Sequence, residues 1–476
     1  MFLILAALYL ITRLPILTYV PFMQDEAFYS VMIEEQIAHP TTVVTLFDYP
    51  VGWKPPLFFW ISGFFVQFLR GLPIPIEAVY RLPNILFGLI NVFLVYFIFE
   101  KVTGEKNESF VMALVYITMG VPIHTELRVL TDTMCGTFIF AGVLSYIKGL
   151  EDSRWFLFGG IFTFLAYFVK QSNAAVVPIV AVALILQTDR KKLLNPLLII
   201  SLFAFPVATA LEDISFNAPL GDMTTHFAKT TLLDKLKPES LGGSILGLFP
   251  LTTIWLVISV FGFWKNWNGK VGMSAWYCLI IFPLIAGVLM PFYFYPVIPA
   301  IAYFAVKFLS KDGQKTKMDQ FFYIVFFICV IVGYVIGTAN HIEYKKYYLP
   351  QKNIGEFLVG KENVLIIGEY QPAVIAYKML EEKRATGRWL DCGLIVFPKT
   401  SNNDTYYQLI QNYSIGRSDV VDGNFGGLFE HNLTYRKSTN ITKFEYIVIT
   451  GNKTDINPGG TLVLQDFNIK VYHVDN

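Results

Sequence analysis

Charged residues are scarce in this chain: they make up 15% of its 476 residues, whereas hydrophobic residues make up 54%. Soluble domains rarely show this balance, so the composition predicts an integral membrane protein. The net charge of +1 offers no basic surface and argues against nucleic acid as a partner. We find neither a phosphate-binding glycine loop nor an internal repeat, which argues against a nucleotide-sugar site and a repeat array.

Cysteine is rare as well. Cys135, Cys278 and Cys329 lie inside apolar runs, and Cys392 stands alone near the C-terminus. This spacing matches neither a disulfide framework nor a zinc motif. The cysteines are therefore expected to be ordinary buried side chains.

Long apolar runs fill the first 340 residues, and a run of about 20 residues is enough to cross a bilayer. We predict eleven membrane-spanning helices, at about residues 2–20, 82–100, 110–123, 133–150, 155–169, 174–187, 193–211, 243–264, 272–290, 291–309 and 320–338. The run at residues 55–69 is short and opens with two prolines. It is either a further span or a helix in the membrane interface.

Positive charge predicts the orientation, because cytoplasmic loops concentrate Lys and Arg. The basic clusters alternate with the other loops and comprise Lys101 and Lys106, Lys148 and Arg154, Arg190 to Lys192, Lys265 and Lys270, and Lys307 to Lys317. The alternation predicts a cytoplasmic N-terminus and one long outer loop at residues 21–81, in which residues 55–69 do not cross. In a prokaryote the membrane would be the cell membrane.

Residues 341–476 are predicted to form a small extracytoplasmic α/β domain, separate from the membrane domain at residues 1–340. Its strand-like segments are residues 363–367, 393–397 and 446–450, and its helix-like segment is 373–383. An outer location agrees with five glycosylation acceptor sequences, at Asn403, Asn412, Asn432, Asn440 and Asn452.

The outer loop holds the most specific sequence features. It begins with Asp25 and Glu26 directly after the first span, where charged groups are costly unless they are used. An Asp at this place is also an ordinary helix cap. The loop continues with Lys54-Pro55-Pro56-Leu57 and ends at Arg81-Leu82-Pro83.

These three motifs, D-E-A-x-Y, K-P-P-L and R-L-P, together resemble the dolichyl-phosphate-mannose protein mannosyltransferase family and its bacterial relative, the lipid A aminoarabinose transferase. Further matches follow at residues 128–132, 167–170 and 295–299. The resemblance covers about residues 1–340 and implies the GT-C architecture, a multi-helix membrane domain whose outer face binds a polyprenyl-phosphate sugar. It also implies that Asp25 is the catalytic carboxylate.

The chemistry of sugar transfer requires the same residue types. An acceptor hydroxyl loses a proton as it attacks the sugar, and a carboxylate such as Asp25, with Glu26 beside it, can accept that proton. Negative charge grows on the leaving phosphate, so cations should face it. The candidate cations are Lys54, Arg81, Lys170 and Arg128. A basic residue at a helix end also commonly reaches to lipid headgroups without any specific ligand.

Three further features are open to two interpretations. Asp132 either pairs with Arg128 on one helix or joins Asp25 in a site for Mg or Mn. Residues 212–242 are either a solvated loop or an amphipathic helix that covers a groove for acceptor or lipid. The candidate residues of that groove are His226, Tyr293 and Tyr295.

Two departures from the family pattern matter. Trp53 stands where the aminoarabinose transferases have an acidic residue, so their sugar recognition is not expected to transfer. No basic residue accompanies Pro291-Phe292-Tyr293, which puts a phosphate contact from that loop in doubt.

The sequence thus predicts a glycosyltransferase that moves a sugar, with inversion, from a polyprenyl phosphate to a hydroxyl of a protein, glycan or lipid on the outer face. One alternative is a transporter or channel whose path is lined by Asp25, Glu26 and Asp132. The predicted spans 2 to 11 carry few acidic residues, which disfavours it. The other alternative is an inactive relative that only binds the lipid-linked sugar.

Overall fold

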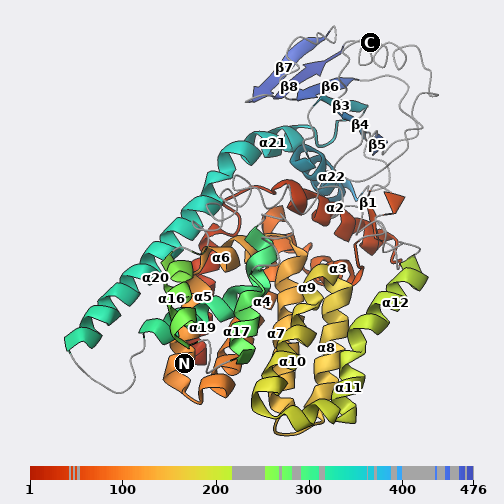
Figure 1. Ribbon diagram of the computed structural model, residues 1–476. Coiled ribbons are helices and arrows are strands. Elements are labelled where there is room, and N and C mark those ends of the chain that lie inside the picture. Colours follow the sequence, from red (N-terminus) through yellow and green to blue (C-terminus); the bar gives the residue numbers. More distant parts are fainter. Residues whose placement is uncertain are drawn as a thin grey trace, which may run out of the picture.

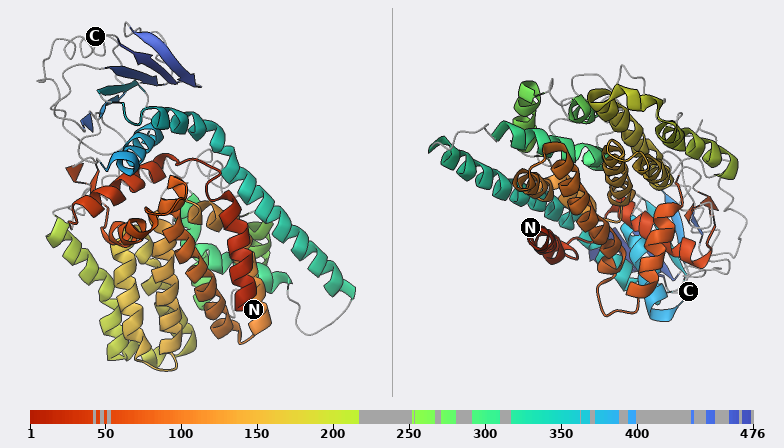
Figure 2. Two further views of the ribbon diagram at one scale, coloured as in Figure 1. Left: turned by 180° about the vertical axis from the view of Figure 1, so that it is seen from behind. Right: turned by 90° about the horizontal axis from the view of Figure 1, so that it is seen from below.

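The computed structural model describes residues 1–41, 44–46, 49–50, 54–216, 252, 254–266, 271–280, 291–309, 317–361, 363–368, 372–387, 394–398, 435–436, 445–450, 460–466 and 469–474. The protein consists of a bundle of helices with a β-sheet at one end (Figure 1). The first helix of the outer loop, α2 (Gln24–Ala38), lies across the end of the bundle that faces the sheet (Figure 2).

Each predicted span overlaps one helix or one broken helix of the bundle. These helices are α1 (Phe2–Arg13), α4 (Ile76–Thr103), α5 (Lys106–Thr118), α6 (Gly120–Glu126), α7 (Thr131–Gly149), α8 (Trp155–Val169), α9 (Gln171–Ala174), α10 (Val176–Thr188), α11 (Pro196–Leu202), α12 (Ala204–Phe216), α16 (Ile254–Asn266), α17 (Val271–Cys278), η4 (Pro291–Val297), α19 (Ile298–Leu309) and α20 (Lys317–Glu343). Short 3-10 turns follow α1 and α10, at η1 (Leu14–Ile16) and η2 (Arg190–Leu194).

Length limits how many of these helices can cross a membrane alone. Within the described ranges, four are long and apolar enough, namely Ile76–Thr103, Gln171–Thr188, Phe292–Leu309 and Phe326–Phe357. The pair α5 and α6, bent by 60°, makes a fifth if it is one span. The predicted positions of the apolar segments are thus those of helices, while the count of eleven crossings stays a prediction.

The outer loop folds into two helices and a small hairpin. Its helices are α2 (Gln24–Ala38) and α3 (Leu57–Leu69), and its hairpin pairs β1 (Thr45–Leu46) with β2 (Tyr49–Pro50). The 13 residues of α3 extend about 20 Å, less than the roughly 30 Å of a hydrocarbon core. Its length therefore agrees with a helix that does not cross.

The bundle holds a buried acid that the sequence analysis did not place in a span. Glu126 ends α6, is fully buried, and pairs with Arg13 of α1 at 2.9 Å between Nη2 and Oε2. Tyr295 donates a hydrogen bond to its other oxygen at 2.8 Å. Since the charge is paired and hydrogen-bonded, it has the character of a structural ion pair rather than a permeation path.

After α20 the chain bends into α21 (Lys345–Phe357) and enters the sheet. Residue 340, the predicted domain boundary, lies inside α20. The remaining elements are β3 (Val364–Gly368), α22 (Pro372–Thr386), β4 (Leu394–Pro398), β5 (Tyr435–Arg436), β6 (Tyr446–Thr450), β7 (Thr461–Asp466) and β8 (Ile469–His473). The strand order is β5-β4-β3-β6-β8-β7, with β3 parallel to β4 and β6.

Strands β3, β4 and β6 and helix α22 thus each begin within one residue of the predicted segment. The five glycosylation acceptor asparagines lie outside the described residues.

Buried charges join the sheet domain to the outer loop. Lys383 of α22 donates to Glu34 of α2 at 2.5 Å. Tyr377, also in α22, donates to Glu77 of α4 at 2.7 Å and accepts from the backbone N–H of Phe22 at 2.9 Å. The C-terminal domain and residues 21–81 therefore occupy the same end of the bundle.

The basic loops gather at the opposite end, where the N-terminus also lies (Figure 1). Lys101, in the last turn of α4, pairs with Glu151 between α7 and α8 at 2.9 Å. Lys192, after α10, donates to the carbonyl of Leu150. The predicted separation of basic loops from the carboxylate-bearing loop is thus a separation in space.

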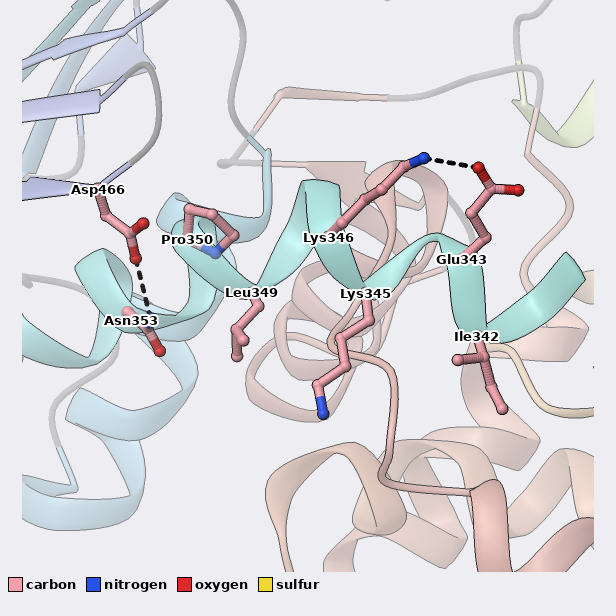
Figure 3. A pocket seen from close by; sticks show the side chains of 8 residues that line it. All are labelled: Ile342, Glu343, Lys345, Lys346, Leu349, Pro350, Asn353 and Asp466. Carbon is pink, nitrogen blue, oxygen red and sulfur yellow. Dashed lines mark hydrogen bonds and ion pairs between the residues drawn. The ribbon is translucent and has the colours of Figure 1, made fainter. Parts of the chain in front are cut away.

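A groove of about 560 Å³ runs along α20 and α21 beside β7 (Figure 3). Its lining combines lysines with apolar side chains and comprises Ile342, Glu343, Lys345, Lys346, Leu349, Pro350, Asn353 and Asp466. Asn353 donates to Asp466 at 2.9 Å and so ties α21 to the sheet. No predicted site residue in the described ranges lines this groove.

Candidate active site

The outer loop is anchored by a buried ion pair between α4 and α2. Arg81 donates to Glu26 through Nε at 2.8 Å and Nη2 at 2.9 Å. Its other N–H groups bind the carbonyls of Leu17, Val20 and Pro21. All five donors of this guanidinium are thereby used within the protein. Arg81 has no donor left for a phosphate and instead fixes the turn between α1 and α2.

Glu26 completes the anchor. Its carboxylate also accepts from the backbone N–H groups of Met23 and Val129, both at 3.0 Å. It therefore connects α2 with α4 and with the segment between α6 and α7. A carboxylate whose oxygens already accept four hydrogen bonds has no free position for a substrate hydroxyl and is poorly suited to act as its base.

Asp25 contrasts with its neighbour. It lies in the first turn of α2 and is half-buried. In the part of the chain that the structure describes, no group donates a hydrogen bond to its carboxylate. A negative charge is favoured at a helix N-terminus without any such bond. Asp25 is therefore open to a ligand.

Lys54 lies beside Asp25. Its ammonium group donates to the hydroxyl of Tyr29, one turn after Asp25 in α2, and is 4.5 Å from the centre of that ring. Burial, together with the charge of Lys170, lowers the pKa of Lys54 to about 7, and the charges of Asp25 and Asp132 partly oppose this effect. Burial also raises the pKa of Tyr29. One group of side chains thus contains two acids, two lysines and a phenol, namely Asp25, Asp132, Lys54, Lys170 and Tyr29.

Asp132 and Lys170 form the second half of this group. Lys170, at the break between α8 and α9, donates to Asp132 in the first turn of α7 at 2.6 Å, and Asn173 donates to the same oxygen at 3.2 Å. The ring of Tyr293 lies 4.0 Å from the lysine nitrogen. The helical pair between Arg128 and Asp132, one of the two sequence interpretations, is not formed.

Arg128 lies in another surrounding. It belongs to the short segment between α6 and α7, where it contacts His124 at 3.2 Å and the ring of Tyr344 at 5.1 Å. Of the four predicted cations, only Lys54 and Lys170 therefore come together. Sequence cannot show this separation, because each of the four stands next to an apolar run.

The two predicted groove tyrosines also separate. Tyr293 faces Lys170, whereas Tyr295 is fully buried, donates to Glu126 and accepts from Asn91 at 2.8 Å. Tyr295 thus belongs to the packed interior and lines no groove. His226 lies outside the described residues.

Two site residues escaped the sequence analysis. Asn173 supports Asp132, and its only signal is its place three residues after Lys170. Asn84 donates to the carbonyls of Arg128 and Leu130 at 2.5 and 2.8 Å, and so shapes the segment that precedes Asp132. An asparagine inside an apolar helix is such a signal, because a buried amide needs partners. Trp53 lies outside the described residues.

A divalent metal fits this group poorly. Within the described ranges, no three His, Cys, Asp or Glu side chains are arranged to hold a metal. Asp25 and Asp132 share their surroundings with Lys54 and Lys170, whose charges compete with a cation. The arrangement suits an anion that approaches the two lysines.

Comparison with known proteins now identifies the architecture. Residues 53–211 match the model of a family described as dolichyl-phosphate-mannose-protein mannosyltransferase. The crystal structure of ArnT from Cupriavidus metallidurans bound to undecaprenyl phosphate aligns over 99% of this chain and 97% of its own, with a TM-score of 0.65 and 12% identity. The chain has the GT-C fold.

A second GT-C structure agrees. The archaeal oligosaccharyltransferase AglB from Archaeoglobus fulgidus, in complex with an inhibitory peptide and a dolichol-phosphate, aligns over 94% of this chain and 69% of its own. Its TM-score is 0.54 and its identity 10%. No curated protein sequence matches the chain.

The resemblance expected from the motifs is thereby confirmed, and the residues matched by the family include Lys54, Asp132 and Lys170. Relatives with the GT-C fold are multi-pass integral membrane proteins.

Proposed function

We propose that this chain is a membrane glycosyltransferase that moves a sugar from a polyprenyl phosphate to a hydroxyl group on the outer face of the membrane, with inversion. The observation that carries the proposal is the contrast between adjacent carboxylates. Glu26 is fully committed to Arg81, whereas Asp25 is open and shares a site with Lys54 and Lys170. The undecaprenyl phosphate and dolichol-phosphate bound by ArnT and AglB support a lipid phosphate as carrier.

The reaction follows from the charges. Asp25 accepts the proton of the acceptor hydroxyl as its oxygen bonds to the anomeric carbon. The bond from that carbon to the phosphate breaks, and the carrier leaves as a phosphate with one more negative charge. Lys54 and Lys170 stabilise that charge in a poorly hydrated site. A single displacement inverts the anomeric carbon.

Other residues of the site act through these three. Glu26 and Arg81 hold the first turn of α2, and Asp132 with Asn173 holds Lys170. The proposal contains no metal, because the carboxylates face lysines. Its acceptor is a protein, glycan or lipid.

The distribution of charge supports a site on the outer face. Basic loops mark the cytoplasmic side of membrane proteins, and here they lie at the end opposite to Asp25 and the sheet domain (Figure 1). A site on the outer face suits a lipid-linked donor, since nucleotide sugars are cytoplasmic compounds. In this proposal the N-terminus is cytoplasmic and the C-terminal domain is extracytoplasmic.

The test compares the wild type with Asp25→Asn in lipid nanodiscs, using a panel of polyprenyl-phosphate sugars and an acceptor-rich extract. We expect Asp25→Asn to lower turnover about 100-fold or more, with the donor Kd changed less than about threefold. The matched control is Asp152→Asn, because Asp152 is exposed at the opposite end and an amide oxygen can still accept from Arg154.

Each alternative predicts its own result. An inactive sugar binder binds a donor in the wild type without turnover. A transporter or channel shows neither donor binding nor turnover. Equal turnover in Asp25→Asn and wild type would contradict the assigned base while leaving the transferase in place.

A further inference from the structure

A second group of nitrogen donors lies next to Asp25, and no protein group in the described ranges satisfies it. Arg128 is 9% exposed and its Nε has no hydrogen-bond partner there. His341 of α20 is fully buried, and neither of its ring nitrogens has a partner in the same ranges. Buried polar atoms are seldom left in this state, because each lost bond costs stability.

These donors belong to one compact cluster. The rings of His124 and His341 are 6.0 Å apart, and the only hydrogen bond that the side chain of Arg128 makes within the described residues is to His124 at 3.2 Å. Tyr344 covers the guanidinium at 5.1 Å and packs on His124 at 5.7 Å. Three elements, α6, α20 and the segment before α7, thus present a cation and imidazole nitrogens to one place.

The cluster adjoins the proposed base. Burial lowers the pKa of Arg128, and the nearby charges of Glu26 and Asp25 partly oppose this effect. Glu26 is committed to Arg81 and cannot serve as the partner of Arg128. The fork of a guanidinium matches a phosphate, and imidazole nitrogens can bind its remaining oxygens.

The cluster is also placed to receive a lipid. α20 runs along one side of the bundle (Figure 1). Its exposed side chains include the apolar Phe327, Ile331 and Val335. Such a surface faces acyl chains. His341 lies in the last turn of this helix, beyond the apolar face, at the end of the bundle that carries Asp25.

We propose that Arg128, His124 and His341 bind the phosphomonoester of a second membrane lipid, which presents its hydroxyl to Asp25. This cluster shares no residue with the site of Lys54 and Lys170, to which the proposed function assigns the donor phosphate. The role of the lipid as acceptor rests on the proposed transferase function; the binding pocket does not.

The test measures binding to the full-length protein in detergent by calorimetry. The probes are short-chain phosphatidic acid, short-chain phosphatidylcholine as its control, inorganic phosphate, and a short isoprenyl phosphate mannose for the donor site. The variants are Arg128→Met, His341→Gln and Lys54→Met. We expect Arg128→Met to weaken phosphatidic acid binding about tenfold or more and to leave the donor analogue within about threefold. Lys54→Met should have the reverse effect.

A wild-type measurement keeps the test valid if a variant fails to fold. Phosphatidic acid should not displace the donor analogue, because the two occupy different pockets. Displacement, or a loss of donor binding in folded Arg128→Met, would assign Arg128 to the donor site and overturn the proposal. Equal binding of phosphatidic acid and phosphatidylcholine would mean that water alone satisfies the nitrogen donors of Arg128, His124 and His341. That result would also overturn the proposal.

The inorganic phosphate arm separates the two sources of the anion. Inorganic phosphate that binds as tightly as phosphatidic acid would overturn the lipid part and assign the pocket to a soluble phosphate. Because none of these measurements needs turnover, a protein that binds phosphatidic acid through Arg128 but transfers no sugar would refute the proposed function alone.

Discussion

Lys54 is a residue whose charge changes near neutral pH. Burial and Lys170 lower its pKa to about 7, so it is cationic below that pH and increasingly neutral above it. The phosphodiester of a polyprenyl-phosphate sugar keeps its single charge throughout this range. We expect the donor Kd to rise by up to about tenfold per pH unit above 7, until the pKa of the donor-bound state is reached. Arginine stays charged, so Lys54→Arg should bind the donor with a flat pH profile.

The ion pair of Glu26 and Arg81 is expected to stabilise the fold. Glu26→Gln leaves a buried guanidinium without its counter-charge, which typically costs about 3–5 kcal/mol. We expect a lowered Tm for Glu26→Gln and a nearly unchanged Tm for Asp25→Asn, because the Asp25 carboxylate accepts no bond from the described residues. Melting curves of both variants, measured in the same lipid, check this difference. Equal melting temperatures would show that Glu26 is no anchor.

The sequence predicted which residue types belong to the site, but it did not predict the partners of each residue. The motifs identified Asp25 and Lys54, and both lie in the site. The partners of Arg81 were not predictable, because the carbonyls that it binds come from a turn that no pattern marks. The same holds for Asp132, whose partner Lys170 lies 38 residues along the chain.

At the scale of elements, α22 should hold α2 in place from outside the membrane. Tyr377 connects Glu77 of α4 with the backbone of Phe22, just before α2. Tyr377→Phe removes both bonds and should lower kcat about tenfold while the donor Kd stays within about threefold, because a small misplacement of a catalytic group mainly affects the chemical step. The control is Tyr472→Phe in β8, a strand remote from α2. A change in donor Kd with kcat preserved would argue against this positioning role.

Elements were predictable wherever composition alone decides. Apolar runs located the helices, and alternation located β3, β4 and β6 within one residue. Composition does not show where a helix bends or which way a side chain points, however. Because of the 60° bend between α5 and α6, Glu126 lies inside the bundle, whereas the predicted spans place it in a loop. For the same reason the sequence could not separate Tyr293 from Tyr295.

At the scale of the whole molecule, the remaining question is which end faces the cytoplasm. Glu151 lies in a basic loop at one end, and Glu356 lies in α21 at the other. In a background without native cysteines, Glu356→Cys should react with an impermeant maleimide on intact cells, and Glu151→Cys only after permeabilisation. The reverse pattern would place Asp25 in the cytoplasm. The enzyme would then take its donor from the cytoplasmic leaflet. The proposed location of the reaction on the outer face would be wrong even if Asp25→Asn abolished turnover.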